Sequence, residues 1–247
     1  MVPLPLPLLQ RALIGSATPR SLVGVFHGLG DSMQTLRPAA EAWSRALPHA
    51  AFVLYQAPSR DYFGRQLKGG EFSGDWFAEG STRAFAVGES DEQHYAATIS
   101  DRVDHVSAEL DAELRRFGLS DDRMALAGFS QGAALSLYTG LRRGCAGALA
   151  LGGPCQDVAT REALLPAAPS ESDCRICAVV GDADPYADHA AIAASLARFG
   201  GGGGGREREH DGVQVVPGLE HEVGEQSIAL GLAFLADLKL DAAEDER

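Results

Sequence analysis

Short apolar runs alternate with longer segments of helical periodicity along most of the chain. The runs are rich in apolar and β-branched residues and end at glycine or polar residues, a pattern typical of strands buried on both faces. We expect strands at about 22–26, 51–55, 124–127, 146–151, 176–180 and 212–216. We expect helices at about 35–47, 91–117, 188–199 and 225–240, with another that ends near Arg143. This alternation predicts an α/β fold with a mostly parallel sheet and helices on both faces.

The segment 91–117 has the clearest helical period. Its apolar positions recur at steps of four and three: Tyr95, Ile99, Val103, Val106, Leu110, Leu114 and Phe117. Acidic residues lie between them: Asp101, Asp104, Glu109, Asp111 and Glu113. A stripe of this kind indicates an amphipathic helix with one face on the core. We therefore expect the acidic face to be solvated, and His94 and His105 to be exposed.

The segment 57–90 has no clear period. It holds several glycines and six of the 17 aromatic residues of the chain: Tyr62, Phe63, Phe72, Trp76, Phe77 and Phe85. A long aromatic loop in a compact domain is uncommon and suggests a binding or covering role. The alternative, that these rings only pack the loop onto the core, has equal weight.

The length of 247 residues fits one α/β domain. Within it we expect an irregular N-terminal segment at 1–20, a glycine-rich insertion at 200–211 and a frayed acidic tail at 241–247. The six consecutive glycines at 200–205 are not followed by Gly-Lys-Ser/Thr, so this tract is not a phosphate-binding loop.

Charge and composition exclude several classes of partner. The net charge is −13 and no basic cluster is present, which argues against binding nucleic acid or an anionic membrane surface. Prolines at every second position near the start argue against a secretory signal, and no run approaches the ~20 apolar residues of a membrane span. The Cys174–Cys177 pair lacks a second ligand pair for a metal. We expect reduced thiols in a cytoplasmic protein with no stable membrane anchor.

A serine stands between two glycines in Gly128-Phe129-Ser130-Gln131-Gly132, directly after an expected strand. This sequence fits G-x-S-x-G, in which the serine occupies a sharp turn between a strand and a helix. Side chains at the glycine positions would collide with the adjoining strand and helix. The N-terminus of the following helix directs N–H groups to where negative charge would develop. The context of the pattern decides whether Ser130 is a nucleophile.

Other polar residues also follow expected strands. His27, Asp182, Asp184 and His221 each come shortly after one, as Ser130 does. In a parallel sheet the carboxyl ends of the strands form the edge where ligands bind. We therefore expect these side chains to meet at one edge of the sheet. Several polar residues at one edge are much stronger evidence for a site than any one of them alone.

A serine hydroxyl needs a base to take its proton, and imidazole suits this near neutral pH. In this fold the acid and the histidine follow the serine in that order. Of the later histidines, His189 begins a helix and His210 lies beside the glycine tract, whereas His221 follows a strand through a Pro-Gly turn. We therefore expect His221 to be the base.

The orienting acid stays open at this point. Asp182 and Asp184 both lie in the loop after the strand at 176–180, and their positions do not separate them. Asp157, Asp173 and Asp188 lack such a strand-end position. The aspartate that does not orient the base would cap the turn, because aspartate readily accepts nearby backbone N–H groups.

These motifs together resemble the acyl-protein thioesterase/lysophospholipase (phospholipase/carboxylesterase) family of α/β-hydrolases. The matching motifs are His27-Gly28-Leu29-Gly30-Asp31, Asp75-Trp76-Phe77, the run from Gly128 to Leu137, Gly181-Asp182-Ala183-Asp184-Pro185 and His221. By position, the resemblance implies Ser130 as nucleophile, Asp184 as orienting acid and His221 as base. It also implies an oxyanion hole formed by the backbone N–H groups of Leu29 and Gln131.

Asp75-Trp76-Phe77 resembles a Trp-Phe-Asp element near the acyl pocket of that family, although the aspartate precedes the aromatic residues here. On this basis we expect Phe72, Trp76 and Phe77 to contact substrate. The resemblance implies a serine hydrolase that cleaves carboxylic esters or thioesters through an acyl-enzyme, without cofactor or metal. Its substrate would be an acylated protein, a lysophospholipid or a small ester. The alternatives are a short-chain carboxylesterase and a non-catalytic binding protein on a hydrolase scaffold.

Overall fold

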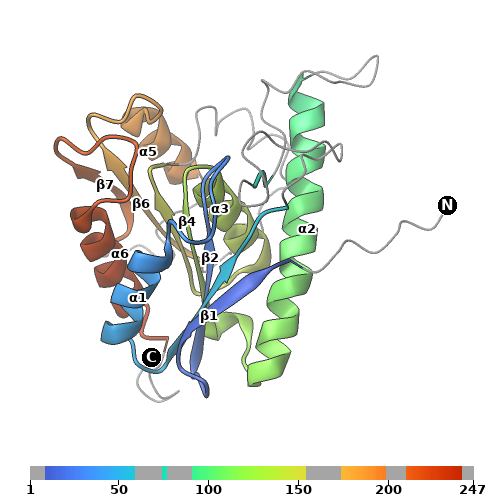
Figure 1. The fold of residues 1–247 in the computed structure, drawn as a ribbon. Helices are drawn as coiled ribbons and strands as arrows, with labels where there is room; N and C mark the ends of the chain where they lie inside the picture. Colours follow the sequence, from blue (N-terminus) through green and yellow to red (C-terminus); the bar gives the residue numbers. More distant parts are fainter. Residues whose placement is uncertain (1–8, 59–73, 77–90, 154–173, 199–209, 241–247) are drawn as a thin grey trace.

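A seven-stranded sheet forms the centre of the molecule in a computed structural model, which describes residues 9–58, 74–76, 91–153, 174–198 and 210–240 (Figure 1). Its strands are β1 (Arg11–Gly15), β2 (Ser21–Phe26), β3 (Ala50–Tyr55), β4 (Met124–Phe129), β5 (Gly147–Leu151), β6 (Arg175–Gly181) and β7 (Gly212–Val216). They are ordered β1-β3-β2-β4-β5-β6-β7 across the sheet. Every neighbouring pair is parallel except β1 and β3.

Helices cover both faces of the sheet (Figure 1). They are α1 (Arg37–Ala46), α2 (Asp91–Phe117), α3 (Gln131–Arg143), α5 (His189–Arg198) and α6 (Glu225–Asp237). The side chains of α1 and α6 pack on one face, and those of α2, α3 and α5 on the other. In β6, Cys177 and Val179 face the first layer, while Ile176 faces the second. Burial on both faces explains why the strands are apolar at successive positions, and it confirms the α/β prediction.

The strand β1 corrects the expectation of an irregular segment at 1–20. It pairs antiparallel with β3, with Arg11 opposite Tyr55 and Gly15 opposite Ala51. As an edge strand it is only half-buried. It therefore needs no continuous apolar run, and its sequence lacks the pattern that indicates the other strands.

The expectation that the acidic face of α2 is exposed is also wrong in part. His105, Glu109 and Glu113 are buried. Arg11 of β1 lies 2.6 Å through Nε from Glu113 Oε1 and 3.6 Å through Nη1 from Glu109 Oε2. Once β1 is in place, the guanidinium of Arg11 lies beside these carboxylates, and this ion pairing offsets part of the cost of burying their charge. The side chain of His94 falls outside what the structure describes.

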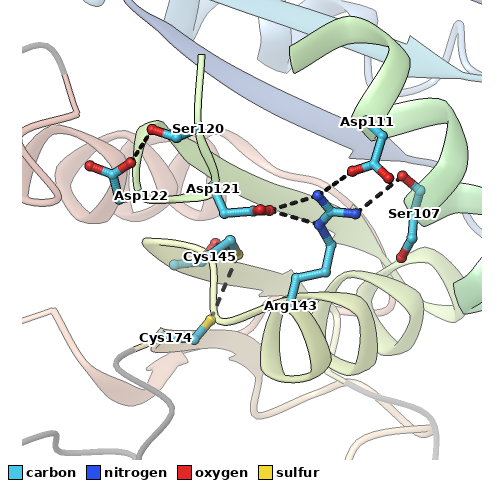
Figure 2. Close-up of polar contacts among 9 residues, drawn as sticks. Ser107, Asp111, Ser120, Asp121, Asp122, Arg143, Cys145 and Cys174 are labelled. Carbon is cyan, nitrogen blue, oxygen red and sulfur yellow. Dashed lines mark hydrogen bonds and ion pairs between the residues drawn. The ribbon is translucent and has the colours of Figure 1, made fainter. Parts of the chain in front are cut away.

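The C-terminal end of α3 is held to α2 by Arg143 (Figure 2). Its Nη2 donates to Asp111 at 2.6 Å and its Nε to Asp121 at 2.8 Å. Beside it, the sulfur atoms of Cys145 and Cys174 lie 3.8 Å apart as free thiols (Figure 2). This end of the sheet is opposite to the one where β4 delivers Ser130.

Several features discussed from the sequence lie outside the described residues: Tyr62, Phe63, Phe72, Phe77, Phe85, the glycine tract at 200–205 and the tail at 241–247. Of the helices that can be described, none has the length and apolar character needed to cross a bilayer. Within the same residues, no group of three or more histidine, cysteine or acidic side chains could hold a metal ion.

Candidate active site

Ser130 occupies a strained turn between β4 and α3. Its backbone has φ 53° and ψ −115°, a region that residues with a side chain rarely adopt. A Cβ atom at Gly128 would lie 2.1 Å from the carbonyl oxygen of Gly132, and one at Gly132 would lie 2.1 Å from that of Phe26. The flanking glycines are therefore required by close backbone contacts, as the motif predicts. The turn presents the hydroxyl of Ser130 at the carboxyl end of β4.

The side chains of Ser130, His221 and Asp184 form one hydrogen-bonded chain. His221 Nε2 lies 3.0 Å from Ser130 Oγ, and His221 Nδ1 lies 2.8 Å from Asp184 Oδ2. The Asp184 side chain is 0% exposed, whereas that of His221 is 22% exposed. Because a carboxylate only accepts, Nδ1 carries the imidazole proton and Nε2 is left to accept from the serine. This arrangement can withdraw the proton of Ser130.

The geometry separates the two aspartates that the sequence left open. Asp184 Oδ1 accepts the backbone N–H of Tyr186 at 2.8 Å, so its second oxygen is turned toward His221. Asp182 Oδ1 instead accepts the N–H of Gly218 at 2.6 Å and ties together the loops after β6 and β7. Asp182 thus has the turn-capping position expected for the other aspartate.

Two aromatic rings enclose the imidazole of His221. Phe129 and Tyr186 each have their ring centroid 4.9 Å from it. Phe129 belongs to the serine motif, and Tyr186 follows Pro185, yet sequence reasoning gave neither a role. Tyr186 is 62% exposed, so the side chain lies beside His221 at the protein surface. Its position two residues after Asp184 was the available indication.

The loop after β2 is held by the buried His27. His27 Nε2 accepts the N–H of Ala57 at 3.0 Å, so the ring proton lies on Nδ1, which donates to the Gly28 carbonyl at 2.7 Å. Burial lowers the pKa of His27 and keeps the ring neutral. Leu29 is 46% exposed, and its backbone N–H makes no hydrogen bond to the part of the chain that the structure describes. His27 therefore shapes this loop and does not join Ser130 and His221.

Trp76 lies in the core. It is 0% exposed, its ring packs edge-on against Phe26, and its indole N–H donates to the His27 carbonyl at 2.8 Å. The expected substrate contact of Trp76 is not supported by this position, which favours the alternative of a ring that packs the loop onto the core. Phe72 and Phe77, the other two expected contacts, lie outside the described residues.

The Gln131 side chain, which sequence reasoning did not consider, is completely buried. Its Oε1 accepts the backbone N–H of Trp76 at 2.8 Å, and its Nε2 donates to Asp75 Oδ1 at 2.8 Å. Asp75 is buried as well. The first residue of α3 is thus joined through its side chain to the segment 74–76.

A mostly parallel sheet that carries a serine, an aspartate and a histidine after β4, β6 and β7 in chain order defines an α/β-hydrolase. Residues 13–235 match the family described as Phospholipase/Carboxylesterase. The chain belongs to this family.

Individual proteins with similar sequences are acyl-protein thioesterases. The chain is similar to acyl-protein thioesterase 1 of Neurospora crassa, with 32% identity over 171 residues that cover 66% of each chain. A protein of the same name from Cryptococcus neoformans is 31% identical over 128 residues, which cover 51% of this chain and 50% of its own. The match therefore spans between half and two thirds of the length of these relatives.

Solved structures show the same fold. Esterase PE8 has a TM-score of 0.69 and 21% identity, over 93% of this chain and 99% of its own. Acyl-protein thioesterase 2 of Zea mays has a TM-score of 0.62 and 19% identity, over 93% of this chain and 98% of its own.

Proposed function

We propose that this protein is a serine hydrolase that cleaves carboxylic esters or thioesters through an acyl-enzyme. The observation that carries the proposal is the continuous chain from Ser130 Oγ through His221 to Asp184, with distances of 3.0 and 2.8 Å. Membership of the Phospholipase/Carboxylesterase family and the likeness to acyl-protein thioesterases support it.

In the first step, Ser130 Oγ attacks the carbonyl carbon of the substrate while His221 Nε2 takes the hydroxyl proton. Asp184 stabilises the imidazolium that results, because its buried carboxylate already accepts from Nδ1. The tetrahedral intermediate then expels an alcohol or a thiol, which receives the proton from His221. Water attacks the acyl-serine in the same way and releases the acid.

The oxyanion of this intermediate needs hydrogen-bond donors. We assign them to the backbone N–H groups of Leu29 and Gln131. Gln131 begins α3, so its N–H lies at the positive end of a 13-residue helix. Leu29 lies in the loop that follows β2, and β2 is the neighbour of β4 in the sheet.

For the substrate class we propose S-acylated protein, lysophospholipid or small ester, with the acylated protein favoured by the names of the relatives. A short-chain carboxylesterase is the second candidate, supported by the family description and by the fold shared with esterase PE8. We place the enzyme in the cytoplasm, in keeping with its free buried thiols.

The nucleophile is tested by reaction with a fluorophosphonate, which modifies activated serines covalently. We expect one adduct on the peptide that contains Ser130, and none in Ser130→Ala. Undiminished labelling of Ser130→Ala would overturn the assignment, and no labelling of the wild type would indicate a non-catalytic protein.

The substrate class is tested with matched oxyesters and thioesters of acetyl, butyryl, octanoyl and palmitoyl groups. A thioesterase of long acyl chains should show kcat/KM rising with chain length on the thioester series. A preference for acetyl and butyryl oxyesters would instead favour the short-chain carboxylesterase.

A further inference from the structure

The two donors assigned to the oxyanion hole come from separate parts of the chain. Gln131 is fixed by the turn: the N–H of Ser130 donates to Leu151 at 2.9 Å, and the Ser130 carbonyl accepts Ala133 N–H at 3.0 Å. Leu29 lies in a loop and is 46% exposed. The distance between the two donors therefore depends on what holds this loop to α3.

The segment 74–76 holds the loop from one side. The N–H of Gly30 donates to the Gly74 carbonyl at 2.9 Å, and the N–H of Gly74 donates to the Asp31 carbonyl at 3.0 Å. The indole of Trp76 donates to the His27 carbonyl at 2.8 Å. Leu29 thus lies between points that are hydrogen-bonded to this segment.

The Gln131 side chain holds the same segment to α3. Backbone N–H groups only donate and carboxylates only accept, so the bonds to Trp76 and Asp75 fix which end of the amide is oxygen. The segment has little room to slide, because a Cβ atom at Gly74 would lie 2.6 Å from Ala57 Cβ. Both partners of the amide–carboxylate bond are buried, which makes its geometry well defined.

We propose that the Asp75 carboxylate and the Gln131 side-chain amide form a positioning pair that aligns the Leu29 and Gln131 N–H groups as one oxyanion hole. The pair acts on the transition state through the segment 74–76 and does not itself touch the substrate. This inference rests on the proposed hydrolase function. A shift of about 1 Å in one donor is enough to cost up to about 100-fold in rate.

The first test removes the acceptor. In Asp75→Ala we expect kcat to fall about 30-fold while KM stays within about threefold, because the oxyanion exists only after attack on the carbonyl. A trifluoromethyl ketone forms a tetrahedral adduct with an active serine and so reports on the hole directly. Its Ki should rise by the same factor as kcat/KM falls.

The second test reverses the polarity of the pair. Gln131→Glu sets two carboxyl groups against each other and should lower kcat at least as much as Asp75→Ala. In the double variant Asp75→Asn/Gln131→Glu, the new amide donates to the new carboxylate, which still accepts the Trp76 N–H. The formal charge of the pair equals that of the wild type, and we expect at least a tenfold recovery of kcat over Gln131→Glu.

Arg175→Met is the control for loss of stability alone. Arg175 begins β6, at the end of the sheet opposite to Ser130, and its Nη2 lies 2.7 Å from Asp211 and 2.6 Å from Asp237. We expect a lower Tm with unchanged kcat and Ki. The proposal is overturned if Asp75→Ala keeps the wild-type Ki, or if the double variant recovers no kcat over Gln131→Glu. If Asp75→Ala does not fold, the comparison of the double variant with Gln131→Glu is the deciding test. A wild type that neither hydrolyses esters nor reacts with fluorophosphonate refutes the proposed function itself.

Discussion

The pair of aspartates after β6 allows a sharp test, because the two differ in what they contact. In Asp184→Asn, the N–H of Tyr186 still requires an oxygen at the position of Oδ1. The new amide NH2 then faces His221 Nδ1 in place of the carboxylate oxygen found there at 2.8 Å. Since this group donates, Nδ1 must become an acceptor and the ring proton moves to Nε2. His221 then has no lone pair for the proton of Ser130.

We expect turnover to fall by about four orders of magnitude in Asp184→Asn, the effect known for the wrong imidazole tautomer. The fold should be little affected, since one charge-assisted hydrogen bond becomes a neutral one, a loss of about 1 kcal/mol. That free energy corresponds to about 2–4 °C in Tm for a chain of this size. The assay is kcat on a soluble ester together with a melting curve.

Asp182→Asn is the matched control in the same loop. An asparagine oxygen can still accept the N–H of Gly218, which Asp182 binds at 2.6 Å. We expect kcat within about threefold of the wild type, since exposed hydrogen bonds contribute little. Turnover that survives in Asp184→Asn, or falls further in Asp182→Asn, would show that the chosen carboxylate is the wrong one.

Three further predictions concern buried groups. Trp76→Phe removes the indole N–H bond to the His27 carbonyl, and Trp43→Phe removes the one to the Ile228 carbonyl, at a cost of about 1–3 kcal/mol each. The Tm should therefore fall by a similar amount in both variants, whereas kcat should fall about tenfold only in Trp76→Phe. Equal kcat in the two variants would contradict this prediction. Arg175→Met should lower Tm by about 10 °C without changing kcat. Arg175 lies 2.7 Å from Asp211 and 2.6 Å from Asp237, and its loss leaves Asp211 without this ion pair in a poorly hydrated position. An unchanged Tm would show that the ion pair is dispensable. Burial raises the pKa of Cys177 to about 12, so iodoacetamide at pH 8 should alkylate this thiol only when urea unfolds the protein. The free energy of unfolding should fall as pH rises from about 9 to 12, because only the thiol of the unfolded chain ionises in that range.

The fold was largely predictable because burial on both sides leaves a clear record in the sequence. The bounds of α2 and β7 agree with the predicted ranges, since a long amphipathic stripe and a glycine-bounded apolar run are local patterns. The edge strand β1 was not predictable because its residues are only partly buried and form no continuous apolar run, and the burial of Glu113 was not predictable because it depends on Arg11 of that strand. Such pairs become visible only when distant segments are placed side by side.

The candidate site was predictable where chain order and strand ends carry the information. Ser130 and His221 lie where the motif and the Pro-Gly turn predict, and their roles stay predictions. The choice between Asp182 and Asp184 required the family resemblance, because two positions in one loop, separated by a single residue, differ mainly in the direction of their side chains. The position of Trp76 was open, since an aromatic ring in a loop has the same sequence pattern whether it faces a ligand or the core.

The positive φ of Ser130 sets the proposed nucleophile against the stability of its own fold. A left-handed backbone of this kind costs a residue with a side chain about 1–3 kcal/mol, and glycine avoids most of that cost. Ser130→Gly should therefore melt at a higher temperature than the wild type while losing all hydrolysis. If sequences were chosen for thermal resistance alone, position 130 would drift to glycine. The proposed role of Ser130 as nucleophile accounts for a serine at this position at the expense of thermal stability.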